Sequence, residues 1–299
     1  MTANTATGNA TARRPGLYAK WEKEIKAFFR NPLGLFGLGG VTLILLVALT
    51  APLLAEPVGG YGVYEERLLP PSAGHPFGTD DMGRDLFSQV VWGTRASFKV
   101  AILAMLTATV VGVPIGLISG YFKGTVDTLC VGLIEIFLTI PMLPLIIIIA
   151  AVTKTQSINT VAFIIGIFSW PTIARITRAS TLKVSSMQYI EAARCLGIRT
   201  SKIIFKHILV NASTPVLINL TVVMATSIIT ESAISFLGLG DPSTFSWGKI
   251  LHNAHKSGAF ASAWWYSFFP SAAIVLFVIS FNFLSMGIRD ALNPKITRG

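Results

Sequence analysis

The sequence predicts an all-α membrane protein with six transmembrane helices, and three observations support this prediction. Hydrophobic residues make up 52% of the 299 residues and charged residues only 13%, about half the charged share usual in soluble domains. The mean hydropathy is +0.65. The apolar residues also form long blocks, each of the roughly 20 residues with which a helix crosses a hydrocarbon core of about 30 Å. These features and the two cysteines exclude soluble, collagen-like, disordered and disulfide-framework classes.

The six apolar blocks lie near residues 33–55, 98–120, 126–152, 159–179, 212–235 and 266–288. Lipid offers no hydrogen-bond partner to a bare backbone, so we expect these blocks to be helices. None alternates apolar with polar residues as a membrane strand would. The first block is too long for the apolar region of a cleavable signal peptide, and we expect it to stay as an anchor. The prediction is an anchor helix over 33–55, an extracytoplasmic loop over 56–97 and a five-helix core over 98–288.

The basic residues predict the orientation of the chain. Most of the 24 Lys and Arg residues precede the first block, lie between the fourth and fifth, or follow the sixth. Basic segments favour the cytoplasmic side, so both termini are predicted to be cytoplasmic, as tails over 1–32 and 289–299. The net charge of +10 therefore reflects topology, and no nucleic-acid partner is predicted.

The first tail also has an amphipathic pattern. Apolar residues recur there at helical spacing, at Leu17, Trp21, Ile25 and Phe28. This pattern predicts a helix in the membrane interface; the alternative is a continuation of the first span.

Two features inside the blocks predict packing or function. Gly112, Gly116 and Gly120 have the spacing that lets two membrane helices approach closely, within this chain or with another subunit. Glu135 lies near the middle of the third block, where a charge is costly and normally faces a bundle interior or water. We expect it to line a pathway or subunit interface, or else to be a protonated or hydrogen-bonded packing residue.

The segment between the fourth and fifth blocks, SSMQYIEAARCLGIRTSKIIFKHILVN, predicts two short helices. Ser185 or Ser186 can cap the first, Gly197 can end it in a left-handed turn, and Thr200 or Ser201 can cap the second. The first helix carries apolar residues beside two charges, and its members are Ile190, Glu191, Ala192, Ala193, Arg194 and Leu196. Such a helix can press into a groove on another protein; the alternative is an interfacial helix that only follows the charge bias.

Two further segments contain residue types found in metal or phosphate sites, but neither predicts such a site. The segment HPFGTDDMGRD contains His75 among acids, but a lone imidazole gives a metal little selectivity. We prefer to interpret this segment as the start of a short helix that Thr79 caps. Asp80 and Asp81 would lie in its first turn, and Arg84 would pair with one of them. Gly248-Lys249 lacks the Ser or Thr and the upstream glycine of a phosphate loop. No catalytic residue, metal or cofactor is predicted.

Several motifs nevertheless resemble one family. Glu191-Ala192-Ala193, followed by Gly197 and His207-Ile208-Leu209, resembles the EAA loop of ATP-binding-cassette (ABC) importer permeases. The segments HPFGTDDMGRDLFSQVVWGTRASFKVA, ESAISFLGLG, SWGKIL and GIRDALNPK resemble the C-type subunit of the dipeptide/oligopeptide/nickel permease family. Val210 stands where that family usually has proline.

The resemblance implies a type I ABC importer permease fold and a non-catalytic subunit of the cell membrane. Its implied partners are a homologous permease, two ATPase subunits and an extracytoplasmic binding protein that delivers short peptides, or alternatively nickel or oligosaccharides. The EAA loop, about residues 180–211, would couple to the ATPases through Tyr189, Ile190, Glu191, Ala192, Ala193, Arg194, Leu196 and Gly197. Glu191 and Arg194 would meet the ATPase, and Ala192 and Ala193 would permit close docking. Glu231, in ESAISFLGLG, is with Glu135 a pathway or interface candidate, and we expect it to orient the outer loop more than to contact substrate. A secondary transporter is the weaker alternative, since few acids lie inside the spans and the two halves do not match.

Overall fold

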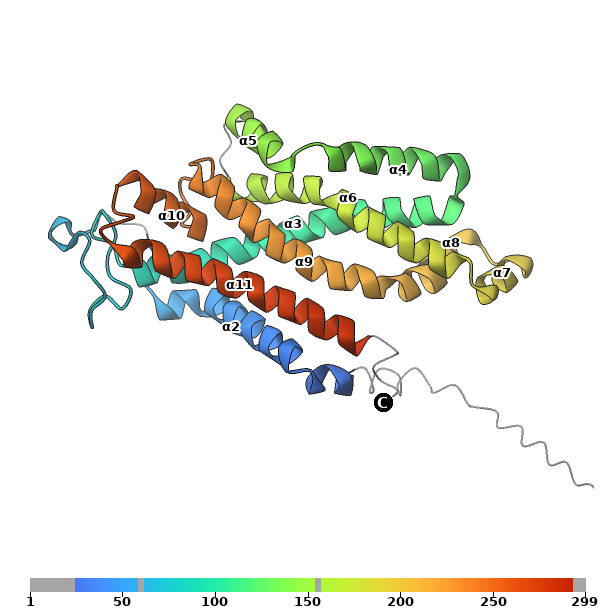
Figure 1. Cartoon of the computed structure of the whole chain (residues 1–299), viewed down its shortest axis with the longest axis horizontal. Coiled ribbons are helices and arrows are strands. Elements are labelled where there is room, and N and C mark those ends of the chain that lie inside the picture. Colours follow the sequence, from blue (N-terminus) through green and yellow to red (C-terminus); the bar gives the residue numbers. More distant parts are fainter. Residues whose placement is uncertain (1–24, 59–61, 154–156, 293–299) are drawn as a thin grey trace, which may run out of the picture.

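The computed structural model describes residues 25–58, 62–153 and 157–292, which form a bundle of long helices (Figure 1). The helices are α2 (Pro32–Leu54), α3 (Leu86–Phe122), α4 (Gly124–Thr139), α5 (Met142–Thr153), α6 (Ile158–Ser185), α7 (Gln188–Cys195), α8 (Thr200–Lys202), α9 (Leu209–Phe236), α10 (Trp247–Lys256) and α11 (Trp264–Ala291). A 3-10 turn, η1 (Tyr64–Glu66), and a π-helical segment, η2 (Ile203–Ile208), complete them. Leu17 and Trp21 of the predicted interfacial helix lie outside the described residues, while residues 25–30 are helical.

The predicted spans are present, but the third is broken. Among the described residues, five helices are long and apolar enough to cross a membrane, and α4 with α5 makes a sixth span if this pair, bent by 79°, counts as one. The break lies at Pro141, before which Ile140 adopts an extended conformation. A residue that precedes proline is sterically disfavoured in the helical region, and proline lacks the N–H that would continue the ladder. The single continuous helix expected over 126–152 is therefore wrong.

Helix α3 begins earlier than the apolar block predicts. Its N-cap is Asp85, whose carboxylate accepts a hydrogen bond from the Ser88 N–H at 2.7 Å. The end of the expected outer loop, from Leu86 to Ser97, is therefore helical. Hydropathy misses this part because polar and charged residues occupy the outer turns of α3, whereas a cap acts through the backbone whatever the hydropathy.

Glycines of α3 allow α6 to pack closely within this chain. A methyl group added at Gly116 would lie 2.5 Å from the Ala174 carbonyl oxygen, and one at Gly112 would lie 2.6 Å from that of Trp170. Gly120 is similarly close to Thr181. The close approach predicted from the glycine spacing is confirmed, and the partner helix that the sequence left open is α6.

A second glycine contact, which the sequence analysis missed, joins α2 to α11. Methyl groups at Gly34, Gly37 and Gly40 would collide with Gly287, Leu284 and Ser280. The signal was available, because three glycines recur at intervals of three residues on one helix face.

The helices form a flattened bundle with two distinct ends. In Figure 1, α4 and α5 lie on one side, α2 and α11 on the other, and α3, α6 and α9 between them. Helix α7 marks one end, while α10 and the segment before α3 mark the other. The start of α2 and the end of α11 both point toward the α7 end, where the Asn31 amide donates to the Asp290 carboxylate at 2.7 Å.

Candidate functional site

Helix α7 ends in the left-handed turn that the sequence predicts at Gly197. The φ angle of Gly197 is +69°, a region that residues with a side chain rarely adopt. Its N–H donates to the Arg194 carbonyl at 3.0 Å, and the Ile198 N–H donates to the Ala193 carbonyl at 3.1 Å. This pair of bonds is a Schellman motif, which satisfies the last carbonyls of the helix.

The start of α7 differs from the prediction that Ser185 or Ser186 caps it. The N-cap residue is Met187, without a side-chain hydrogen bond. Ser185 is instead the last residue of α6, and its hydroxyl donates to the Leu182 carbonyl at 3.0 Å. The Ser186 hydroxyl likewise donates to Lys183. Both serines belong to the end of α6, and α7 begins at Met187 without a side-chain cap.

The predicted second short helix is not separate from the fifth span. Residues from Thr200 to Phe236 form one continuous helical segment, through α8, η2 and α9. The π turn shifts the hydrogen-bond register, since the Leu209 N–H donates to the Ile204 carbonyl. Val210 has a backbone N–H, which the proline usual at this position in the family would lack. The part of the loop from Thr200 onward thus continues into α9 as one helical segment.

Only one face of α7 packs against its own chain. Ile190 and Ala193 are buried in a cluster with Leu117 of α3 and Ile203 and Ile208 of η2. The opposite face is exposed, and it includes Tyr189, Glu191, Ala192, Arg194 and Leu196. Leu196 is 80% exposed, and it lies outside the membrane spans, where lipid does not cover an apolar side chain. The structure therefore divides the two adjacent alanines, since Ala193 faces inward and Ala192 outward.

Arg194 connects α7 to the end of α3. Its guanidinium carbon lies 4.8 Å from the centroid of the Tyr121 ring, a cation–π geometry. The Arg194 side chain is exposed to solvent, and its contact with Tyr121 also fixes it against the end of α3. Nearby, burial raises the pKa of the Tyr189 hydroxyl above its ordinary value.

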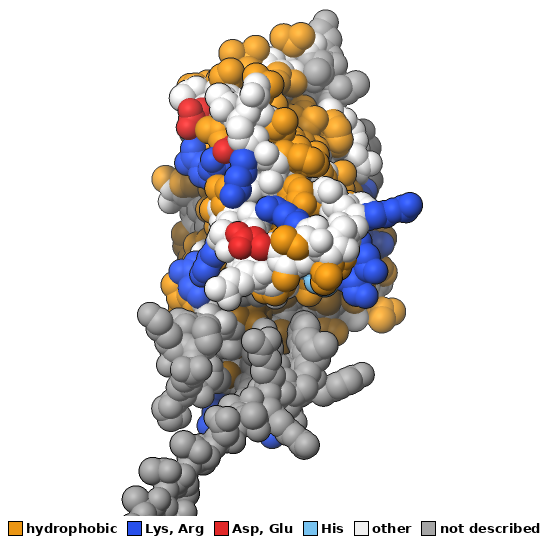
Figure 2. All heavy atoms as spheres, turned by 90° about the vertical axis from the view of Figure 1, so that its right-hand side faces the viewer, with side chains coloured by type: hydrophobic (Ala, Val, Ile, Leu, Met, Phe, Trp, Pro, Cys, Tyr) orange, Lys and Arg blue, Asp and Glu red, His pale blue; other side chains and the backbone are white. Residues whose placement is uncertain are grey.

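The α7 end of the molecule is strongly basic. Figure 2 looks onto this end and shows Lys and Arg side chains around its surface, with few acids among them. The exposed bases of the loop include Lys183, Arg199, Lys202 and Lys206. Glu191 is the acid among residues 185–211. An acidic or mixed-charge protein surface would complement this end.

Beside this end, an ion pair joins three helices. The Arg178 guanidinium of α6 donates two hydrogen bonds to the Asp127 carboxylate of α4, at 2.6 and 2.7 Å. The Ser119 hydroxyl of α3 donates to the same carboxylate. Bidentate pairing gives a defined geometry, so α3, α4 and α6 are held together near the α7 end.

Glu135 is exposed on the surface of α4. Within the described part of the chain, Ile134 is the buried residue of α4, so the helix leaves most of its surface uncovered. Glu135 does not face the interior of this chain. An apolar helix that carries an exposed carboxylate at membrane depth requires water or another subunit beside it.

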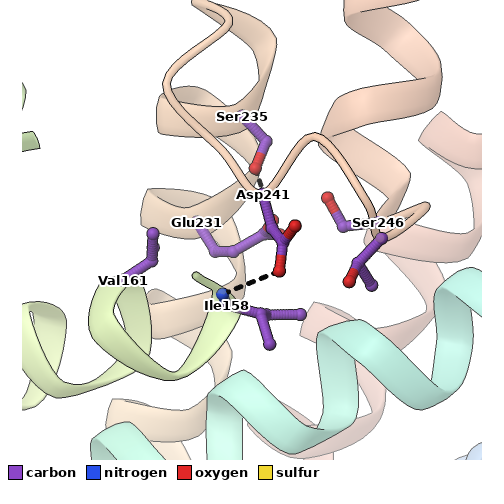
Figure 3. Close-up of a pocket in the computed structure, with 7 residues that line it drawn as sticks. Ile158, Val161, Glu231, Ser235, Asp241 and Ser246 are labelled. Carbon is purple, nitrogen blue, oxygen red and sulfur yellow. Dashed lines mark hydrogen bonds between the residues drawn. The ribbon is translucent and has the colours of Figure 1, made fainter. Parts of the chain in front are cut away.

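At the opposite end of the bundle, Glu231 lies at the bottom of a small pocket (Figure 3). It is 2% exposed, and its Oε1 accepts a hydrogen bond from the Ser235 hydroxyl at 2.6 Å. Its Oε2 has no partner among the described residues. The other polar residues that line the pocket are Asp241, Thr244 and Ser246.

Asp241 ties the loop after α9 to the start of α6. Its carboxylate accepts hydrogen bonds from the Ile158 N–H at 3.1 Å and from the Ser243 hydroxyl at 2.6 Å. Burial alone would raise the pKa of Asp241, but hydrogen bonds, chiefly from Ser243, hold it below its ordinary value. Glu231 and Asp241 thus approach the same pocket from α9 and from the outer loop.

The segment before α3 differs from its predicted structure. No helix starts at Thr79, which instead forms an isolated β-bridge with Asp85. The buried Asp80 carboxylate accepts hydrogen bonds from the Arg84 side chain and the Gln89 amide, both at 2.7 Å. The predicted pairing of Arg84 with an acid is confirmed. These bonds join the segment to the first turns of α3 and make it a folded cap on that helix.

The cap is also bonded to α11. The Tyr266 hydroxyl donates to Asp81 at 2.8 Å, and the Trp265 indole N–H donates to the Thr79 carbonyl at 3.3 Å. His75 Nδ1 lies 3.1 Å from Asp85 Oδ1. In the described ranges, no group of three or more His, Cys, Asp and Glu side chains is placed to hold a metal ion.

Two family descriptions match separate parts of the chain. The family described as binding-protein-dependent transport system inner membrane component matches residues 112–298. The N-terminal TM domain of oligopeptide transport permease C matches residues 21–71. The first match covers the end of α3 and the helices after it, and the second covers the anchor helix α2.

Individual relatives agree with these families. The chain is 35% identical to the dipeptide transport system permease protein DppC of Alkalihalophilus pseudofirmus, over 92% of this chain and 90% of the relative. It is 34% identical to the oligopeptide transport system permease protein OppC of Bacillus subtilis, over 93% and 90% respectively. A chain of the inward-facing MetNI methionine ABC transporter aligns with a TM-score of 0.55 at 17% identity, over 69% of this chain and 97% of that chain. The last similarity concerns the fold.

Proposed function

Because the chain belongs to the family of binding-protein-dependent transport system inner membrane components, we propose that it forms, with a homologous permease, a translocation pathway for short peptides. It is a multi-pass cell-membrane permease subunit of the ABC importer type. Relatives named for dipeptides and oligopeptides support peptides as the substrate class over nickel or oligosaccharides.

The proposed complex contains two ATPase subunits and an extracytoplasmic binding protein. The chain itself has no phosphate loop, since Ile250 follows Gly248-Lys249 where Ser or Thr is needed. ATP hydrolysis therefore belongs to the partners, and this subunit is non-catalytic. The basic α7 end is the cytoplasmic end, in agreement with the charge bias of membrane proteins.

The observation that carries the coupling proposal is the two-sided packing of α7. Its inner face, Ile190 and Ala193, is anchored in the chain, whereas Leu196 and Ala192 are exposed outside the spans. Tyr189, Ala192 and Leu196 are exposed together on this short helix outside the spans, and an apolar patch of that kind can be covered by a partner. We assign this surface to the ATPase, with Glu191 beside it.

Movement of α7 would reach the spans by two routes. The first is the continuous helix from Thr200 to Phe236, which transmits a rigid-body displacement directly. The second is the contact of Arg194 with Tyr121, which pulls on the end of α3. Closure of the ATPases would thus tilt α9 and α3 together.

We place the pathway along the uncovered side of α4 and α5. Glu135 is exposed there, and its carboxylate would favour the protonated amino terminus of a peptide. Glu231 lies behind the pocket beneath the outer loop, and we assign it the positioning of that loop, without substrate contact.

The proposal is tested with an Ala192→Arg variant of the complete transporter in proteoliposomes. A bulky charge on the exposed face of α7 should keep the thermal unfolding temperature but lower peptide uptake by at least about tenfold, the effect of roughly 1.4 kcal/mol. Ser186→Arg is the matched control, because Ser186 is also exposed but caps the end of α6. Wild-type uptake by Ala192→Arg would refute the docking surface, and uptake of sugars instead of peptides would refute the substrate class.

A further inference from the structure

A groove of about 340 Å³ runs between α2 and α3. Its walls are apolar side chains of the two helices, among them Leu45, Leu49, Phe98, Ile102 and Leu103. Leu49 is 69% exposed, so the groove is open along the side of the bundle. In Figure 1, α2 lies on the side opposite α4 and α5, and the groove is therefore separate from the proposed pathway.

Two basic residues, Arg95 and Lys99, line this groove, and their depth follows from a contact between α2 and α3. The indole N–H of Trp92 donates to the Ala55 carbonyl at 3.2 Å, which places Trp92 level with the outer end of α2. Arg95 and Lys99 follow one and two turns along α3, about 4.5 and 10 Å deeper at 1.5 Å per residue. Both positions fall near the outer boundary of the hydrocarbon core, within reach of the headgroups for a long side chain.

Neither cation is paired with an acid in the part of the chain that the structure describes. The acid–base pairs among the described residues involve His75, Arg84 and Arg178, and not Arg95 or Lys99. The guanidinium carbon of Arg95 lies 5.8 Å from the centroid of the Trp92 ring. Uncompensated cations at this depth are costly unless an anion accompanies them.

We propose that this groove binds one anionic phospholipid of the outer leaflet. The phosphate would lie between Arg95 and Lys99, and an acyl chain would follow Leu45, Ile102 and Leu103 toward the membrane centre. An anionic head joined to a long apolar chain matches the two cations and the apolar walls at once. Guanidinium and ammonium groups one helical turn apart can both donate to phosphate oxygens.

The test measures lipid retained by the full chain, extracted together with its native subunits and exchanged into mixtures of phosphatidylglycerol and phosphatidylcholine. Native mass spectrometry should show selective retention of phosphatidylglycerol. Arg95→Gln and Lys99→Gln should each weaken that retention about fivefold, and the double variant about 30-fold, from the attraction typical of one base near a lipid headgroup. Lys256→Gln, an equal charge change at the end of α10, should leave retention unchanged.

A second variant tests the acyl-chain part of the groove. Leu49→Trp fills the groove without altering charge, and it should reduce retention of both lipids. Two results would overturn the proposal. One is wild-type phosphatidylglycerol retention in a folded Arg95→Gln/Lys99→Gln double variant. The other is efficient crosslinking of a Leu49→Cys variant to another polypeptide in the membrane, which would mean that a subunit covers the groove.

Discussion

The guanidinium carbon of Arg194 lies 4.8 Å from the centroid of the Tyr121 ring, so the helix at the tip of the molecule is attached to the end of α3. This contact and the continuous helix into α9 are two separate connections from α7 to the spans. They predict that coupling can be weakened without loss of the fold.

Removal of the Tyr121 ring should lower the amount of peptide imported for each ATP hydrolysed. A cation–π contact at an exposed site is worth about 0.5–1 kcal/mol, so Tyr121→Ala and Arg194→Gln should each reduce this ratio about two- to fivefold. Tyr121→Phe keeps the ring face and serves as the control. Because the two residues act as one contact, the double variant should be no worse than the poorer single variant. Additive losses would show that they act independently.

Enlargement of Gly116 should destabilise the α3–α6 contact. A methyl group there would lie 2.5 Å from both the Ala174 carbonyl oxygen and the Thr177 Cβ. Overpacking of this kind costs about 1–3 kcal/mol, which thermal unfolding in detergent should detect as a lower midpoint for Gly116→Ala. Gly132 of α4 has open space around it, so Gly132→Ala should not lower the midpoint. Equal midpoints for the two variants would contradict the packing.

Neutralisation of Glu135 should weaken the transport of peptides with a free amino terminus. Loss of about 1 kcal/mol of attraction corresponds to a roughly fivefold higher KM in Glu135→Gln. Uptake of N-acetylated peptides should not change, because they lack the positive charge. Glu65→Gln, an exposed acid of the outer turn η1, is the control. Unchanged kinetics for both peptide types would assign Glu135 to packing.

The pH dependence of stability should reveal the Asp241 anchor. Hydrogen bonds hold the pKa of Asp241 below its ordinary 3.8, so the ionised group stabilises the folded state. This contribution is complete above the ordinary pKa and is lost as the pH falls through the lowered folded-state pKa. The difference in unfolding midpoint between wild type and Asp241→Asn should be constant above about pH 5 and shrink toward pH 3. A difference that did not change with pH would mean that the carboxylate charge is irrelevant.

The outcome for α7 shows how far local pattern could predict the site. The glycine turn at Gly197 was predictable, because a Schellman motif depends on a few consecutive residues. The different roles of Ala192 and Ala193 were not, because the direction of each side chain depends on where α3 and η2 pack. The stacking of Arg194 on Tyr121 joins residues far apart in sequence, and no local signal announces it.

By itself, the sequence determined the membrane class, the number of apolar blocks and the position of the glycine face on α3. These are local quantities, set by hydrophobic length and by spacing along one helix. Only the tertiary structure decided that α6 is the partner of those glycines and that Asp80 bonds the outer cap to α3. It also decided how sharply α4 and α5 bend at Pro141 and which face of α7 stays open. The helix that packs on the glycines and the open face of α7 depend on contacts between distant segments, which become defined only when the helices pack.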